Sequence, residues 1–87
     1  MALKKEKERQ LIEAFPNPAV SYSNIVVGYE YKEGFVTVFD INGRLIQTIQ
    51  IAGERTVPVG LSGLSQGVYI IEVKTDVSKD SVKVIKK

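Results

Sequence analysis

The side chains of this chain that could do acid–base chemistry are carboxylates and amines. The 87 residues contain no histidine and no cysteine, so a Ser–His–Asp site, a thiolate metal site and a disulfide framework are all excluded. The central carboxylates are scattered over expected strands and turns, without a close pair or an apolar pocket that would raise a pKa. They are Glu30, Glu33, Asp40, Glu54, Glu72 and Asp76. The sequence therefore predicts a protein that is not an enzyme and that needs no metal or cofactor.

Charge is distributed unevenly along the chain. The net charge is +2, to which residues 1–9 contribute +2, residues 79–87 contribute +3 and the residues between them −3. A nucleic-acid surface needs a continuous basic face with aromatic side chains between the charges. Basic ends on an acidic body do not supply one. We therefore expect no nucleic-acid partner and interpret the ends as solvated tails.

The length allows one domain, which buries only about 60% of its unfolded surface. No apolar run approaches the roughly 20 residues of a transmembrane helix, and Met1 is followed by charged residues instead of a signal-peptide core. We expect no direct insertion into a membrane. Taken alone, the chain would be expected to stay in the cytoplasm.

The strongest structural signal is the stretch Phe35–Ile51, in which two β-rich runs flank an Asn42-Gly43 pair. Such a pair favours a type I′ turn, because Asn and Gly reach positive φ with least strain. That turn would place Asp40 opposite Leu45. It also predicts that Val36, Val38, Leu45 and Ile49 line one face and that Phe39 and Ile46 pack on the other.

The other segments are also typical of short strands and turns. Residues 1–14 read as a charged linker or leader, in which Ile12 and Ala14 could dock, and Phe15–Ala19 forms a boundary because its prolines suit only an edge. Gly28 indicates a bulge or a close backbone contact. The remaining strands are expected at Ile25–Tyr31, Arg55–Leu61 with Pro58 on a sheet edge, Val68–Thr75 and Ser81–Ile85, with Leu61 and Leu64 closing the core from the loop at residues 60–67.

Six or seven short strands without a convincing helix predict an all-β fold, a small antiparallel Ig-like β-sandwich. A partly open barrel is the competing architecture. The residues expected to be buried are Val36, Val38, Leu45, Ile49, Tyr69, Ile71, Val73, Val82 and Val84.

Three signatures follow one another in a fixed order: Phe15–Ala19 (FPNPA), Val36–Arg44 (VTVFDINGR) and Leu64–Ile71 (LSQGVYII). Together with the basic end Ser81–Lys87, they resemble the C-terminal sorting domain of the type IX secretion system of Bacteroidetes. The resemblance covers residues 15–87. Each motif alone is weak, whereas their order and spacing are specific.

The resemblance implies a folded secretion signal at the end of a larger cargo protein. Such a signal passes through the periplasm, is recognised by translocon components of the outer membrane, and is commonly removed by a sortase-like cysteine protease when the cargo is attached at the cell surface. On this reading residues 1–14 are linker, residues 15–87 are the sorting domain, and the chain is an excised part of an exported precursor.

Most motif residues have a structural interpretation. Asn42 and Gly43 are expected to shape the hairpin, and Tyr69 to be a core aromatic whose hydroxyl reaches the surface. For Asp40 two interpretations stay open, an acceptor of backbone amides near the turn or a solvated flanking carboxylate. The expected structural residues are Pro16, Asn17, Pro18, Asp40, Asn42, Gly43 and Leu64. The candidates for translocon recognition are Lys83, Lys86, Lys87, Gly67 and Tyr69, because outward charges on a terminal strand add little stability.

Two other functions stay open at this point. An Ig-like adhesive or spacer module would act through its folded surface and would be indifferent to the terminal charges. An oligonucleotide-binding barrel would bind single strands in a salt-dependent way, which the acidic middle argues against. A weak homodimer is compatible with each of these readings.

Overall fold

The computed structural model describes residues 11–87, and the part of the leader at residues 1–10 lies outside the described residues. The fold is all-β, with seven strands and no helix in the described chain. The strands are β1 (Ile12–Phe15), β2 (Tyr22–Val27), β3 (Gly34–Asp40), β4 (Leu45–Ile51), β5 (Thr56–Gly60), β6 (Gly67–Thr75) and β7 (Lys79–Lys86). The predicted small antiparallel sandwich is confirmed.

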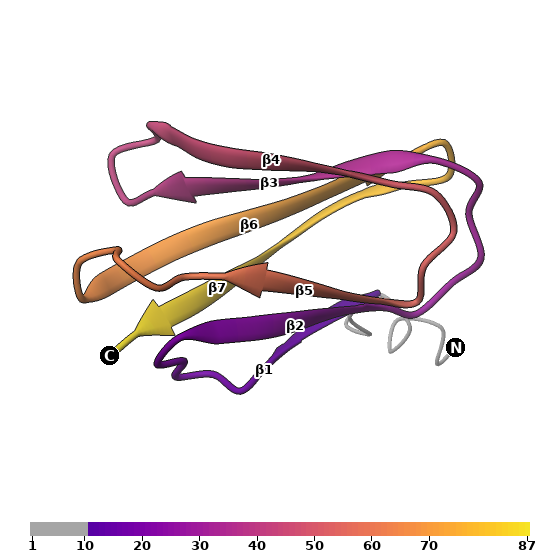
Figure 1. Cartoon of the computed structure of the whole chain (residues 1–87). Coiled ribbons are helices and arrows are strands. Elements are labelled where there is room, and N and C mark those ends of the chain that lie inside the picture. The colour runs from indigo at the N-terminus through magenta and orange to yellow at the C-terminus, as the bar shows by residue number, and fades with distance from the viewer. Residues whose placement is uncertain (1–10) are drawn as a thin grey trace, which may run out of the picture.

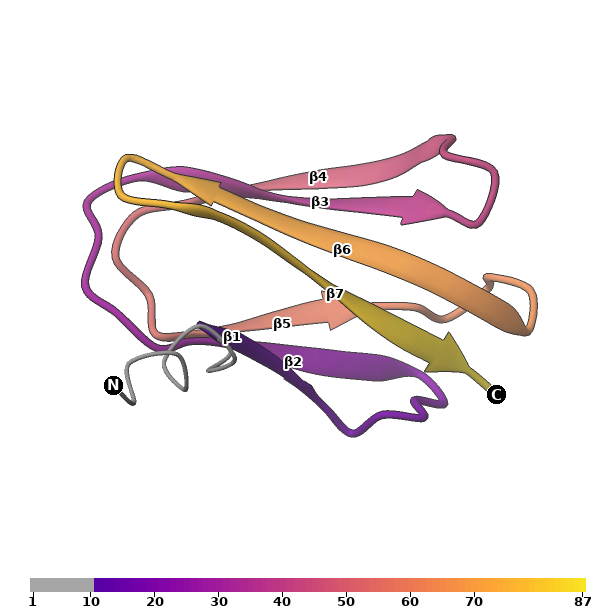
Figure 2. The same ribbon diagram turned by 180° about the vertical axis from the view of Figure 1, so that it is seen from behind.

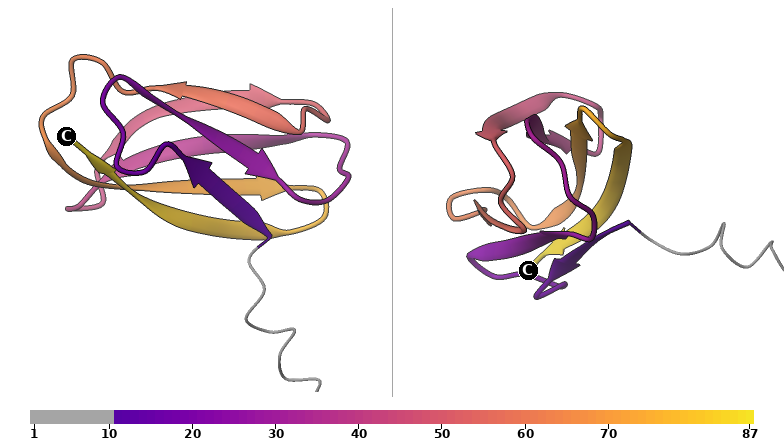
Figure 3. Two further views of the ribbon diagram at one scale, coloured as in Figure 1. Left: turned by 90° about the horizontal axis from the view of Figure 1, so that it is seen from below. Right: turned by 90° about the vertical axis from the view of Figure 1, so that its right-hand side faces the viewer.

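Two antiparallel sheets face each other (Figures 1 and 3). One has the strand order β1-β2-β5 and the other β4-β3-β6-β7. Alternate side chains of each strand point into the space between the sheets. The largest fully buried side chains come from both sheets and from the loop after β5: Ile25, Val27, Val36, Val38, Val59, Leu61, Ile71, Val73 and Val84. Each such side chain stabilises the fold by roughly 1.5–3 kcal/mol.

The central hairpin keeps the predicted register only away from its turn. Val36 lies opposite Ile49 and Val38 opposite Gln47, but the register then shifts and Phe39 lies opposite Leu45. The shift leaves Ile46 as an extra residue on β4, which is a β-bulge. Because a one-residue slip exchanges the two faces of a strand, Leu45 is 57% exposed while Ile46 packs against the core.

The prediction of a type I′ turn was wrong. The backbone amide of Gly43 donates to Asp40 O (2.9 Å) and that of Asp40 to Arg44 O (3.0 Å), which encloses three loop residues instead of two. Among residues 11–87 only glycines have positive φ, and Gly43 has φ 85°. This is the three-residue hairpin loop that closes on a left-handed glycine next to a bulge. Asn42 therefore does not need the strained conformation that the sequence suggested.

The predicted core was mostly right. Val36, Val38, Tyr69, Ile71, Val73 and Val84 are buried, as expected. Ile49 and Val82 are only partly buried, because β4 and β7 are the outer strands of their sheet. Pro58 lies on β5, which is also an edge strand, as its missing amide donor requires.

The β2 strand ends earlier than predicted. It stops at Val27, and Gly28 turns away with its amide donating to Leu11 O (2.9 Å). Tyr29 and Tyr31 leave the strand, and the Tyr31 hydroxyl donates to Glu54 O (2.6 Å). The expected close backbone contact at Gly28 is present. At the same end of this sheet, β1 begins at the buried Ile12, which pairs with Val27 and lies three residues before the boundary expected at Phe15.

Candidate recognition site

The motifs that are far apart in the sequence meet at one end of the sandwich. The β1–β2 connection, the β3–β4 turn, the β5–β6 loop and the C-terminus all lie on the left in Figure 1, and on the right when the molecule is seen from behind in Figure 2. We call this end the motif end. It comprises Asn17–Ala19, Asp40–Arg44, Leu61–Tyr69 and Lys83–Lys87. The described chain enters β1 at the opposite end.

The first motif holds the last strand through the side chain of Asn17. Its amide nitrogen donates to Lys83 O (2.8 Å), and its amide oxygen accepts from the backbone amide of Ile85 (2.9 Å). Ala19 continues the contact, because its amide donates to Ile85 O and its oxygen accepts from the amide of Lys87, both at 2.7 Å. The segment thus covers the outer edge of β7. Sequence reasoning expected an edge position here but missed the partner, because 66 residues separate Asn17 from Lys83.

The β6 motif lies directly beside the same strand. Gly67 pairs with Lys86 and Tyr69 with Val84, so the structure brings the recognition candidates of the two segments together. Tyr69 is buried and its hydroxyl donates to Ser65 O (2.7 Å), which ties the loop to the strand. Leu64 packs against the core from that loop. Tyr69 therefore shapes the site and offers little surface of its own.

The three lysines do not share one face. Lys83 and Lys86 are three positions apart on β7, so the alternation of a strand sends them to opposite sides of the sheet. Lys83 and Lys87 are exposed, and Lys86 is partly buried with its amine donating to Lys87 O (3.3 Å). Within residues 11–87 the ion pairs are Asp40–Arg44 and Glu72–Lys79. The three terminal lysines are therefore free of carboxylate partners in the described chain.

Asp40 organises the turn of the motif end. One carboxylate oxygen accepts the backbone amides of Asn42 and Arg44, both at 2.9 Å, and the other lies 3.4 Å from the Arg44 guanidinium. The hydrogen bond from the Arg44 amide, helped by that from Asn42, holds the pKa of Asp40 below its ordinary value. The expectation that Asp40 accepts backbone amides is confirmed.

Replacing Asp40 with asparagine is expected to reduce the loss of stability that the domain shows as the pH falls. The folded-state pKa of Asp40 is lowered, so its contribution is complete above the unfolded-state pKa and is lost as pH falls through the folded-state value. Melting temperatures measured between about pH 7 and about pH 2 should therefore fall less steeply in Asp40→Asn. Glu30→Gln is the control, since Glu30 is exposed and accepts no hydrogen bond from the described residues. Parallel curves for Asp40→Asn and the parent would contradict the assignment.

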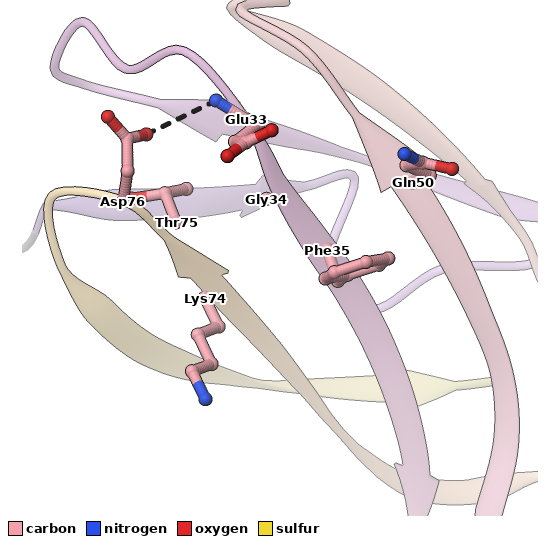
Figure 4. A pocket seen from close by; sticks show the side chains of 7 residues that line it. All are labelled: Glu33, Gly34, Phe35, Gln50, Lys74, Thr75 and Asp76. Carbon is pink, nitrogen blue, oxygen red and sulfur yellow. Dashed lines mark hydrogen bonds between the residues drawn. The ribbon is translucent and has the colours of Figure 1, made fainter.

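A shallow hollow lies at the opposite end of the molecule, between β3, β4 and β6 (Figure 4). It is lined by Glu33, Gly34, Phe35, Gln50, Lys74, Thr75 and Asp76. The Asp76 carboxylate is already engaged, because it accepts the backbone amides of Lys32 (2.9 Å) and Glu33 (3.2 Å), which lower its pKa. Sequence reasoning missed this contact, for which an aspartate within a turn is the only local signal.

No group of three or more potential metal-ligating side chains occurs in residues 11–87. The described part also contains no helix long and apolar enough to cross a membrane. What the motif end can offer is a shaped surface with basic groups.

Comparison with known families shows to which family the chain belongs. The family described as "Secretion system C-terminal sorting domain" matches residues 13–87. The chain belongs to this family. None of the curated proteins matches the chain significantly.

As a sorting domain, the chain is a C-terminal signal for type IX secretion. It directs a larger precursor to the cell surface or into the medium and interacts with the type IX secretion machinery. Its family consists of sorting signals and is not known as enzymatic. The match begins at residue 13, inside β1.

Proposed function

We propose that the sorting domain is recognised at its motif end by translocon components of the outer membrane, and that Lys83, Lys86 and Lys87 supply the charge for this recognition. The observation that carries the proposal is that the first motif and the β6 motif flank the end of β7, while the β3–β4 turn lies at the same end of the sandwich (Figure 1). Gly67 and Tyr69 pair with Lys86 and Val84 of β7. The side chain of Asn17 binds the backbone of β7 at Lys83 and Ile85.

The arrangement of the two ends suits a signal that is attached to cargo. The described chain enters β1 at one end of the sandwich, while the motif end lies at the other (Figure 1). A translocon could therefore bind the motif end while cargo extends from the opposite side. We propose that residues 1–14 act largely as linker, that a sortase-like cysteine protease cuts there after passage from the periplasm through the outer membrane, and that the cargo stays at the cell surface.

A spacer module of Ig-like type is the alternative function. It would use the same sandwich and would not depend on the terminal lysines. Self-association is a separate property, and we propose that a weak homodimer would form through the outer edge of β4. Within residues 11–87 this edge strand pairs with β3 alone, and it carries no charge from Leu45 to Ile51, so it lacks the usual protection against strand pairing.

The test is export of a periplasmic reporter fused to the whole chain in a bacterium with type IX secretion. We expect the parent fusion to reach the cell surface and the triple variant Lys83→Gln, Lys86→Gln, Lys87→Gln to be exported poorly. Substitutions at such surface sites change stability by no more than about 0.5 kcal/mol, so the melting temperature of the isolated domain should stay nearly unchanged.

A matched control removes the same charge from elsewhere. Lys32→Gln, Arg55→Gln and Lys74→Gln also delete three positive charges, but these residues lie outside the motif end. This control should be exported like the parent. Normal export of a folded Lys83/Lys86/Lys87 variant would refute a role for the terminal charges and favour a search around Leu64–Tyr69.

A further inference from the structure

The outward face of the four-stranded sheet carries contiguous apolar side chains at the motif end. We call them the outer patch: Phe39, Leu45, Val68, Ile70 and Ile85. The strand register places Phe39 between Leu45 and Ile70, and Val68 beside Ile85. Directly paired residues share a face with Cβ atoms about 5 Å apart. The outer patch therefore extends across all four strands.

The outer patch departs from what a solvent-facing sheet normally shows. An antiparallel sheet with one wet face has polar residues on that face. Next to the patch this face does carry Thr37, Thr48 and Glu72, and the exposed Phe35 lies beyond them at the opposite end. At the motif end, in contrast, Leu45 is 57% and Ile85 43% exposed. A contiguous exposed apolar surface of this kind marks a place where another molecule binds.

On these strands the motif residues point inward, whereas the residues of the outer patch point outward. Val38 and Tyr69 stand within the motif segments and point into the core. Their neighbours Phe39, Val68 and Ile70 point outward, because successive side chains of a strand alternate. The motifs thus build the sandwich, whereas the intervening residues form the surface that a partner can contact.

The charges on this face indicate which kind of molecule can bind the outer patch. Lys83 pairs with Ile70 across β6 and β7 and has no carboxylate partner within residues 11–87. The same face bears Lys74 and Lys79 against Glu72, which is paired with Lys79 at 3.8 Å. Two copies would therefore bring surfaces of like charge together. Recognition of an anionic membrane usually needs a cluster of about four to eight basic residues, more than this face provides.

We propose that the outer patch and Lys83 form the docking surface for a protein of the type IX machinery whose contact surface places apolar side chains around at least one carboxylate. An apolar centre with a charged group at its border is the usual build of a specific protein interface. The inference rests on the proposed function and deepens it, since it names the face of the sorting domain that the machinery contacts.

The first test introduces a negative charge into the outer patch. Leu45→Glu and Ile85→Glu should each reduce export of the reporter fusion by about tenfold, because each introduces a charge into the apolar docking surface. Val77→Glu is the matched control, because Val77 is 59% exposed but lies in the β6–β7 turn at the opposite end. It should be exported like the parent. All three isolated domains should melt close to the parent, since each side chain is largely exposed.

The second test identifies the partner during export. A photo-crosslinking amino acid at position 85 should give one adduct with a type IX component, identified by mass spectrometry, and the same group at position 77 should not. Lys83→Glu should weaken the adduct at position 85. An adduct with a second copy of this chain would overturn the proposal. So would flotation of the purified chain with phosphatidylglycerol vesicles that Ile85→Glu abolishes.

Failure of this inference is distinct from failure of the proposed function. If the parent fusion is not exported, the sorting role itself fails. If the parent is exported and the folded Leu45→Glu and Ile85→Glu variants are exported equally well, the sorting role stands and the outer patch is not the docking surface.

Discussion

Replacing Gly34 with alanine is expected to remove most of the stability of this domain. Gly34 begins β3 and pairs with Ile51 on one side and Thr75 on the other. A Cβ atom added to it would collide with the Lys74 carbonyl oxygen and would lie 2.8 Å from Thr75 Cγ2 and 2.9 Å from Thr75 Cα. Two of these atoms are backbone, so the central pair of strands would have to separate. We expect a loss of about 3 kcal/mol or more.

Gly60→Ala is the matched control for this prediction. Gly60 ends β5, has no positive φ, and a Cβ built on it meets nothing within 4 Å. That variant should melt at the parent temperature or slightly above it, because alanine restricts the unfolded chain. Denaturant unfolding of both variants provides the measurement. Equal midpoints for Gly34→Ala and Gly60→Ala would mean that β3 and β6 do not approach as closely as described.

Replacing Asn17 with alanine is expected to release the end of β7. The two hydrogen bonds of its side chain to Lys83 O and the Ile85 amide would be lost, and the adjoining contacts of Ala19 would weaken with them. At about 1 kcal/mol for each hydrogen bond, the loss should be about 2 kcal/mol. The amides of Ile85 and Lys87 should exchange with solvent at least about tenfold faster, since 1.4 kcal/mol corresponds to a factor of ten.

Two further variants sharpen the test of Asn17. Asn17→Asp keeps the acceptor for the Ile85 amide but loses the donor to Lys83 O, so it should fall between alanine and the parent. Asn42→Ala removes an exposed asparagine whose side chain makes no hydrogen bond within the described residues, and it should leave the exchange of Ile85 and Lys87 unchanged. Unaltered exchange in Asn17→Ala would show that backbone pairing alone holds the strand.

The contact between Asn17 and β7 also gives a physical reason for the order of the motifs. The first motif supplies the amide that covers the edge of the last strand, and the β6 motif pairs with that strand on its other side. The recognition candidates at the end of β7 therefore depend on residues from both ends of the domain. A truncation at either end would remove part of the same site.

Much of the fold could be predicted from local patterns. The alternation of Val36 and Val38, or of Tyr69, Ile71 and Val73, has the period of a strand with one buried face, and the structure buries all five residues. Pro58 indicated an edge strand because it lacks an amide donor. These properties depend on neighbours along the chain, and a single sequence displays them directly.

The places where prediction failed each depend on a partner far away in the sequence or on the exact course of the backbone. The three-residue turn and the bulge at Ile46 exchange the faces of Leu45 and Ile46, although the Asn42-Gly43 pair is equally suited to a shorter turn. The same shift exposes Leu45 and thereby completes the outer patch.

By itself, the sequence determined the class of fold, most of the buried positions, the absence of histidine and cysteine chemistry, and the family resemblance. Only the tertiary structure decided that Asn17 binds β7, that Gly34 must lack a side chain, and that Phe39, Val68 and Ile85 share one surface. The physical reason is the distance along the chain between the residues that interact. Burial patterns follow from the two-residue period of a strand, whereas pairing between segments more than 60 residues apart depends on how the strands are ordered in the sheets.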